Sequence, residues 1–274
     1  MASNSKQWSS ATPGYIIFLV DQSGSMSEPY PEKGNKANFT SMVINRTINE
    51  LINVNMAGDK VKDRVFISII GYGNPAINEI RSDYISKYAE SPIRIETGKQ
   101  KVSDGNGGLI EIDVQNPIWL EPTASQLTPM GSALEFAKKL VEGWMSKKPD
   151  NPAPVIINIS DGLPYPDDEE QKALKVSKEI MALSCSDGNP IVFNAHIGDS
   201  NAKCICPESV GELPDDQAKF LFEISSKVPD SYIEAAQKQS LAVKTNSKGF
   251  VSNADPETFI KFINFGSSGG SDKR

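Results

Sequence analysis

An uninterrupted run of apolar residues at 15–20 constrains the fold of this chain more than any other segment. Such a run, without polar alternation, is typical of a strand that is buried on both faces of a parallel sheet. Similar, mostly apolar runs lie at 65–70, 155–160 and 190–197, and segments with helical spacing of apolar residues separate them. The pattern therefore predicts an α/β fold with a doubly wound, mostly parallel central sheet and helices on both faces.

The predicted helices lie at about 37–56, 131–147, 168–184, 215–226 and 256–265. Residues 74–122 are irregular, except that 93–96 and 109–114 alternate apolar and polar residues around the glycine-rich stretch 104–108. This alternation predicts a β-hairpin inserted in the domain. The stretch resembles an EF-hand loop but lacks glycine at the sixth position, which favours a plain turn.

The length of 274 residues suits one large domain or two small ones. We expect a flexible lead-in at 1–13, a single domain at 14–266 and a flexible tail at 267–274, where glycine and serine prevail.

Side chains that can bind a metal follow the predicted strand at 15–20. Asp21, Ser23 and Ser25 come in quick succession, and Gly24 allows the backbone to turn so that both hydroxyls face one point. Carboxylate and hydroxyl oxygens are hard ligands, and Mg²⁺ prefers an octahedron of such oxygens with some waters retained. The segment therefore predicts a magnesium site beyond the end of a strand.

Two distant residues complete this candidate site. Asp161 follows the predicted strand at 155–160, and Thr128 lies just before the predicted helix at 131–147. In a doubly wound sheet, ligands bind beyond the carboxyl ends of the strands, where the strand order reverses. We therefore expect the loops that carry Asp21 and Asp161 to meet in one crevice.

The set D-x-S-x-S, T and D-G, in this order, resembles the metal-ion-dependent adhesion site of von Willebrand factor A (VWA) domains. The resemblance implies that Ser23 and Ser25 coordinate Mg²⁺ directly, with Mn²⁺ and Ca²⁺ as alternative ions. It implies that Thr128 binds the ion directly when a ligand is present and through water otherwise. Asp21 and Asp161 would be direct or outer ligands that balance charge and orient the hydroxyls.

The resemblance covers about residues 14–266 and implies a non-catalytic protein-binding module whose ion docks an Asp or Glu of a partner protein. Residues 220–226 and 249–255 look like the cytoplasmic bacterial branch of the family, which is linked to tellurite-resistance and stress clusters. A PP2C-type phosphatase or a Ser/Thr kinase is the partner that this branch implies. The hairpin region at 90–115 and the segment 199–214 depart from the minimal family pattern, so the shape of the binding surface stays open.

The net charge of −7 disfavours non-specific binding to nucleic acid or to an anionic membrane. Residues 1–14 are polar and the run at 15–20 is too short to span a bilayer, so neither a signal peptide nor a spanning segment is predicted. The three cysteines do not suggest a disulfide framework, and the predicted location is cytoplasmic.

The main alternative from another functional class is a metal-dependent phosphatase that uses Asp21. Such enzymes want a second aspartate two residues on, where this chain has Ser23. A serine-hydrolase elbow would need glycines at the positions of Asp21 and Ser25, and His196 is the single histidine. The chain also lacks a phosphate-binding Gly-x-x-x-x-Gly-Lys-Ser/Thr loop, so we predict that the protein is not an enzyme.

Two further expectations concern the cysteines and the role of the ion. Cys185, His196, Cys204 and Cys206 could form a zinc site, but one residue separates the last two cysteines, against the usual two to four, so buried thiols are favoured. We also expect the fold to survive loss of the ion, and Asp161→Ala to fold and to relieve repulsion between the two carboxylates.

Overall fold

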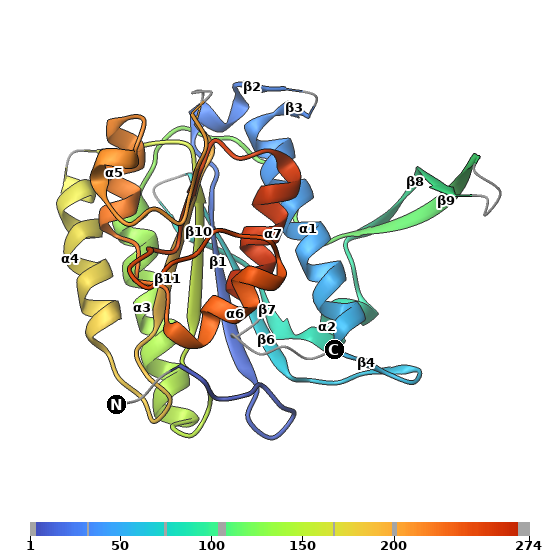
Figure 1. Cartoon of the computed structure of the whole chain (residues 1–274), viewed down its shortest axis with the longest axis horizontal. Coiled ribbons are helices and arrows are strands. Elements are labelled where there is room, and N and C mark those ends of the chain that lie inside the picture. The colour runs from blue at the N-terminus through green and yellow to red at the C-terminus, as the bar shows by residue number, and fades with distance from the viewer. Residues whose placement is uncertain are drawn as a thin grey trace.

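A mostly parallel sheet forms the centre of the computed structural model, which describes residues 4–31, 33–73, 76–103, 108–166, 168–198 and 202–267. Its strands are β1 (Gly14–Asp21), β6 (Val65–Tyr72), β7 (Asn78–Tyr84), β10 (Val155–Ser160), β11 (Ile191–His196), β12 (Cys204–Ile205) and β13 (Phe250–Ser252). Over the described residues their order is β12-β13-β11-β10-β1-β6-β7 (Figure 1). Only the two edge strands, β7 and β12, pair antiparallel with their neighbours.

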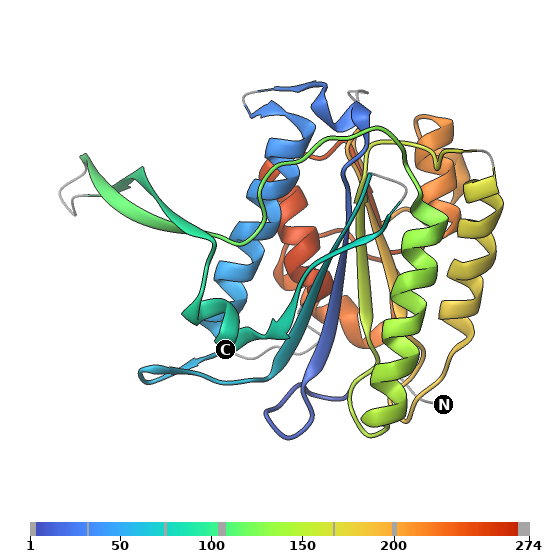
Figure 2. The same ribbon diagram turned by 180° about the vertical axis from the view of Figure 1, so that it is seen from behind.

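Helices cover both faces of this sheet, as Figures 1 and 2 show. One face packs against α1 (Lys36–Val54), α2 (Ile85–Glu90), α6 (Asp230–Lys238) and α7 (Pro256–Ser267). The other packs against α3 (Met130–Lys147), α4 (Asp168–Ala182) and α5 (Asp216–Glu223). Ile16 and Phe18 of β1 point to the first helix layer, whereas Ile17 and Leu19 point to the second. Burial on both faces is the physical reason for the continuous apolar run, and the predicted doubly wound fold is confirmed.

The irregular region predicted at 74–122 is more ordered than the sequence indicates. It contains β7 and α2 in addition to the predicted hairpin. Strand β7 lies at the edge of the sheet beside β6, and its residues are exposed or half-buried. A strand with one neighbour and a solvated face needs no apolar run, so its polar sequence gave no strand pattern. The short helix α6 was also missed.

The predicted hairpin is confirmed as β8 (Arg94–Ser103) and β9 (Leu109–Ile118), which project from the body of the molecule (Figures 1 and 2). Val102 pairs with Ile110, and Ile112 and Val114 follow on the same face of the ribbon. The side chains of Ile110 and Ile112 are 50% and 40% exposed. The predicted turn, and with it the EF-hand resemblance, falls on 104–107, outside the described residues.

The predicted lead-in packs against the domain where the structure describes it, at residues 4–13. Trp8 is buried and lies so close to Gly14 that a Cβ there would be 2.2 Å from the Trp8 ring. The backbone amides of Asn4 and Lys6 donate hydrogen bonds to Asp187, at 2.7 Å to its carbonyl oxygen and 2.8 Å to Oδ1. Of the predicted tail at 267–274, only Ser267 is described, and it ends α7.

Smaller elements lie in the connections. A short hairpin, β4 (Met56–Ala57) and β5 (Lys60–Val61), connects α1 to β6. Of the segment 199–214, residues 202–214 are described and hold β12 and a short 3₁₀ helix, Val210–Glu212. None of the described helices combines the length and the apolar character that crossing a bilayer requires.

Candidate metal centre

The strand order reverses at β1, which has β6 on one side and β10 on the other. Loops that leave the carboxyl ends of β1 and β10 therefore border the crevice where doubly wound sheets bind ligands. Asp21 is the last residue of β1, and Asp161 directly follows β10. Both aspartates predicted from the sequence thus lie at this reversal point.

Asp21 is a buried carboxylate held by two hydrogen bonds. The Ser160 hydroxyl donates to its Oδ2 at 2.5 Å, and the backbone amide of Ser23 donates to its Oδ1 at 2.8 Å. Burial, together with the charge of Asp161, raises the pKa of Asp21 to about 7, although both hydrogen bonds act in the opposite direction. Its charged form therefore lacks enough positive charge nearby, which a bound cation would supply.

Hydrogen bonds connect this carboxylate to the other side of the crevice. The hydroxyl oxygens of Ser23 and Ser25 lie 3.1 Å apart, and the Ser25 hydroxyl donates to Asp161 Oδ1 at 2.8 Å. Ser25 belongs to a 3₁₀ helix, η1 (Gly24–Ser27), that follows β1 directly. A Cβ at Gly24 would lie 2.8 Å from the Ser125 carbonyl oxygen, so glycine lets this turn pack closely against the segment that leads to Thr128.

Thr128 joins the centre through its backbone. Its amide donates to the Tyr165 carbonyl at 3.3 Å, and the Tyr165 amide donates to the Thr128 carbonyl at 2.9 Å. This pairing ties the entry to α3 to the loop that carries Asp161. The structure therefore links four of the predicted site residues in a chain of hydrogen bonds, from Asp21 through Ser23 and Ser25 to Asp161, and holds Thr128 on the adjoining strip of backbone.

Two residues of the centre were not identified from the sequence. Ser160 orients Asp21, and its position between an apolar strand and Asp161 is a local signal that could have revealed it. Lys36, the first residue of α1, is 2% exposed, and its Nζ donates to Asp161 Oδ2 at 3.0 Å and to Glu28 Oε2 at 2.6 Å. A lysine at a helix start is usually solvated, so nothing local in the sequence marks it.

The turn between Glu28 and Lys36 explains how that lysine reaches the crevice. Strands β2 (Pro29–Tyr30) and β3 (Gly34–Asn35) pair as a short hairpin, and the Lys36 amide donates to the Glu28 carbonyl at 3.1 Å. The chain thereby returns from η1 to the crevice before α1 begins.

The donor set fits a small, hard divalent cation. Adjacent ligands of an octahedral Mg²⁺ with metal–oxygen distances of about 2.1 Å lie about 3 Å apart. The 3.1 Å between the hydroxyl oxygens of Ser23 and Ser25 matches this spacing. Two carboxylates on either side of the hydroxyls supply the balancing negative charge.

The four residues considered as a zinc site, Cys185, His196, Cys204 and Cys206, do not form one in the described part of the chain. The Cys185 thiol donates to the Gly188 carbonyl at 3.3 Å, and His196 Nδ1 lies 2.8 Å from the Ser252 hydroxyl. Burial raises the pKa of the Cys204 thiol to about 11 and that of Cys206 to about 12. Within the described ranges, no three His, Cys, Asp or Glu side chains converge as a metal site of those residues would require.

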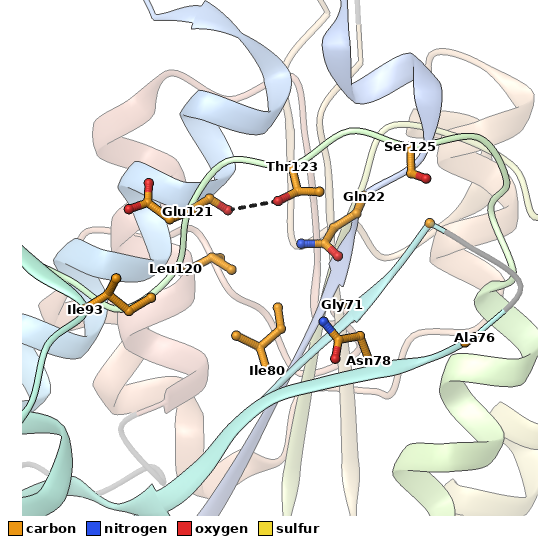
Figure 3. A pocket seen from close by; sticks show the side chains of 11 residues that line it. Gln22, Gly71, Ala76, Asn78, Ile80, Ile93, Leu120, Glu121, Thr123 and Ser125 are labelled. Atoms are coloured by element: carbon orange, nitrogen blue, oxygen red, sulfur yellow. Dashed lines mark hydrogen bonds between the residues drawn. The ribbon is translucent and has the colours of Figure 1, made fainter.

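A pocket of about 270 Å³ adjoins the centre on the β6–β7 side (Figure 3). Gln22 and Ser125 line it, and the Ser125 amide donates to the Gln22 carbonyl at 2.6 Å. Ile80, Ile93 and Leu120 provide its apolar part. Gln22 follows Asp21 directly, so the pocket lies next to the loop that carries Ser23 and Ser25.

One solved structure shares the fold with a TM-score above 0.5. The pilus adhesin SpaC from Lactobacillus rhamnosus GG matches with a TM-score of 0.52 and 11% identity, over 94% of this chain and 30% of that chain. This chain is a doubly wound α/β domain. The similarity to SpaC concerns the fold alone, because the sequence identity is only 11%.

Other structures match less closely. Proximal thread matrix protein 1 from the mussel byssus has a TM-score of 0.45 and 13% identity, over 94% of this chain and 48% of that chain. The vWF domain of the pilus tip protein Mfa5 from Porphyromonas gingivalis has a TM-score of 0.45 and 10% identity, over 94% of this chain and 95% of that chain. The chain thus spans less than half the length of SpaC and of the byssus protein. Neither a scan against protein-family models nor a search of curated proteins finds a match.

Proposed function

We propose that this chain is a VWA-type, metal-dependent protein-binding module without catalytic activity. The observation that carries the proposal is the pair of hydroxyls on Ser23 and Ser25, held 3.1 Å apart at the reversal point of the sheet. A carboxylate stands on each side of this pair, and each accepts a hydrogen bond from a serine hydroxyl. The arrangement presents oxygen lone pairs at the spacing that Mg²⁺ uses.

Each residue has a distinct role in this proposal. Ser23 and Ser25 hold Mg²⁺ directly, with Mn²⁺ and Ca²⁺ as alternatives, and Thr128 joins them directly or through water. Asp21 and Asp161 balance the charge; Asp161 accepts from the Ser25 hydroxyl, and Asp21 accepts from the backbone amide of Ser23. When bound, the ion supplies a positively charged position that an Asp or Glu of a partner protein can fill.

The surroundings of Asp21 favour binding over phosphatase chemistry. A nucleophilic carboxylate needs an oxygen that can reach a phosphorus atom, but Asp21 is 1% exposed. Its two oxygens accept hydrogen bonds from Ser160 and from the Ser23 amide. The hydroxyls of Ser23 and Ser25 contact each other, and that of Ser25 also contacts Asp161. His196 Nδ1 lies instead 2.8 Å from the Ser252 hydroxyl, so these contacts do not pair the histidine with either serine of the centre as a general base.

The partner and setting rest on the resemblance of the sequence to the cytoplasmic bacterial branch of the family. On that basis we propose a PP2C-type phosphatase, a Ser/Thr kinase or another protein of a tellurite-resistance or stress cluster as the partner, in the cytoplasm. Thr128→Ala should weaken partner binding more than ion binding. Partner capture with and without EDTA, read by mass spectrometry, tests this part.

Calorimetric titration with Mn²⁺ tests the metal centre itself. Ser25→Ala should weaken binding at least about tenfold, because it removes a direct ligand and the hydrogen bond to Asp161. Ser27→Ala is the matched control, since this hydroxyl belongs to the same 3₁₀ helix but donates to the Gly24 carbonyl. Equal affinity in wild type and Ser25→Ala would contradict the assignment. Turnover of a phosphate ester that is lost in Asp21→Ala would favour the phosphatase instead.

A further inference from the structure

The Lys36 ammonium lies inside the candidate metal centre. Its side chain is 3% exposed, and that of Asp161, 3.0 Å away, is 2% exposed. The second carboxylate that it contacts, Glu28 at 2.6 Å, is 54% exposed. Lys36 and Asp161 therefore form a buried ion pair, with Glu28 on the solvent side.

This ion pair restricts what Asp161 can do. Its Oδ1 accepts from Ser25 at 2.8 Å, and its Oδ2 accepts from Lys36. Fixed at both oxygens, the carboxylate turns the Ser25 hydroxyl proton toward itself and leaves the lone pairs of that hydroxyl for a cation. The geometry favours an orienting role for Asp161 over direct coordination.

Lys36 also changes the charge of the centre. A divalent ion beside Asp21 and Asp161 would form a neutral group with little net attraction for another carboxylate. Glu28 adds little to this balance, because its side chain is largely in water. The buried ammonium adds one positive charge beside Asp161, so the ion-loaded centre attracts a further carboxylate more strongly than it would without Lys36.

Packing alone does not explain a lysine at this position. Burial of an ammonium costs free energy even when it is paired, and an apolar side chain of similar volume is often as stable or more so. The position starts α1 beside the crevice.

We propose that Lys36 is a positioning and charge-setting residue of the centre, which weakens binding of the ion and strengthens docking of the acidic group. This inference rests on the proposed function. It assigns the net attraction for a partner carboxylate to a residue of this chain rather than to the ion alone.

Mn²⁺ and acetate serve as probes. Calorimetry measures Mn²⁺ affinity, and water proton relaxation of the Mn²⁺-loaded protein reports acetate binding as the loss of metal-bound water. Lys36→Met should bind Mn²⁺ about tenfold more tightly and acetate about tenfold more weakly, because one charge close to the ion is removed. Lys36→Arg should restore both affinities to near the wild-type values. Glu28→Gln is the control, since it keeps the ammonium on Asp161 and should change acetate binding less than threefold.

The possible outcomes separate the two proposals. Wild-type affinities for both probes in Lys36→Met would overturn the role of Lys36 and leave the metal centre in place. Loss of acetate binding in Lys36→Arg as well would show that shape matters instead of charge, and would also overturn it. Absence of Mn²⁺ binding in the wild type would overturn the proposed function and this inference together. Circular dichroism checks each fold, and Lys36→Gln replaces Lys36→Met if the latter does not fold.

Discussion

The Ser25 hydroxyl donates a hydrogen bond to Asp161 Oδ1 at 2.8 Å across 136 residues of sequence. This contact joins the loop after β1 to the loop after β10, so the two halves of the candidate centre are held together by protein groups. Lys36 reinforces the link from the start of α1. The protein's own side chains thus organise the candidate centre.

Removal of the ion should therefore leave the fold intact. The apolar clusters on both faces of the sheet supply the core, and the centre occupies loops at one end. Circular dichroism in EDTA should show a folded chain, whereas Mg²⁺ at a hundred times its dissociation constant should raise the free energy of unfolding by about 2.7 kcal/mol. Unfolding in EDTA would instead make the ion a structural one.

Asp161→Ala should destabilise the protein, contrary to the expectation from the two carboxylates alone. The substitution relieves repulsion on Asp21 but removes the Asp161 carboxylate from the buried Lys36 ammonium. We expect a loss of about 2 kcal/mol, less than for a fully buried pair, because Glu28 still contacts Lys36.

Urea unfolding of Asp161→Ala, Lys36→Met and the double variant measures this effect. The double variant should be more stable than Asp161→Ala alone, since it no longer buries an ammonium from which the Asp161 carboxylate has been removed. Additive effects of the two substitutions would show that the pair is not coupled.

Stability without metal should fall as pH rises from about 4 to about 7. The pKa of Asp21 is raised from 3.8 to about 7 in the folded chain, so in this window the folded state binds more protons than the unfolded state. The contribution of Asp21 is therefore fully present below the unfolded pKa and is lost as pH passes through the folded one. Urea unfolding in EDTA at several pH values should show this slope in wild type, and Asp21→Asn should remove most of it.

Ion binding should depend on pH in the opposite direction. Because a metal site needs the deprotonated carboxylate and Asp21 has a pKa of about 7, Mn²⁺ should bind about tenfold more weakly at pH 6 than at pH 8. Calorimetry at the two pH values measures this. Equal Mn²⁺ affinity at pH 6 and pH 8 would mean that the charge of Asp21 does not contribute to ion binding.

Ser160→Ala should shift the pH dependence of Mn²⁺ binding to higher pH. The Ser160 hydroxyl stabilises the charged form of Asp21, so its loss raises the pKa of Asp21 further and weakens Mn²⁺ binding at pH 7. Ser68→Ala is the matched control, because Ser68 is equally buried in β6 but its hydroxyl contacts Tyr15 and Ser82. Each variant should cost about 1 kcal/mol of stability, and only Ser160→Ala should change the titration with Mn²⁺.

Much of the fold could be predicted from the local pattern of apolar residues. The runs that became β1 and β10 are apolar throughout because each strand is buried on both faces. Their carboxyl ends share one edge of a parallel sheet, so Asp21 and Asp161 could be placed at one crevice from the sequence. The polar edge strand β7 could not be found in this way, because half of its surface faces solvent.

The sequence by itself determined the central strands β1 and β10 and the two aspartates at their ends, because burial on both faces leaves a mostly apolar run in the sequence. Only the tertiary structure decided what surrounds those aspartates. Lys36 reaches Asp161 because the β2–β3 hairpin returns the chain to the crevice, and Ser160 meets Asp21 because β10 lies beside β1. Such contacts join residues far apart in the chain, so no local pattern says which residue each side chain will meet.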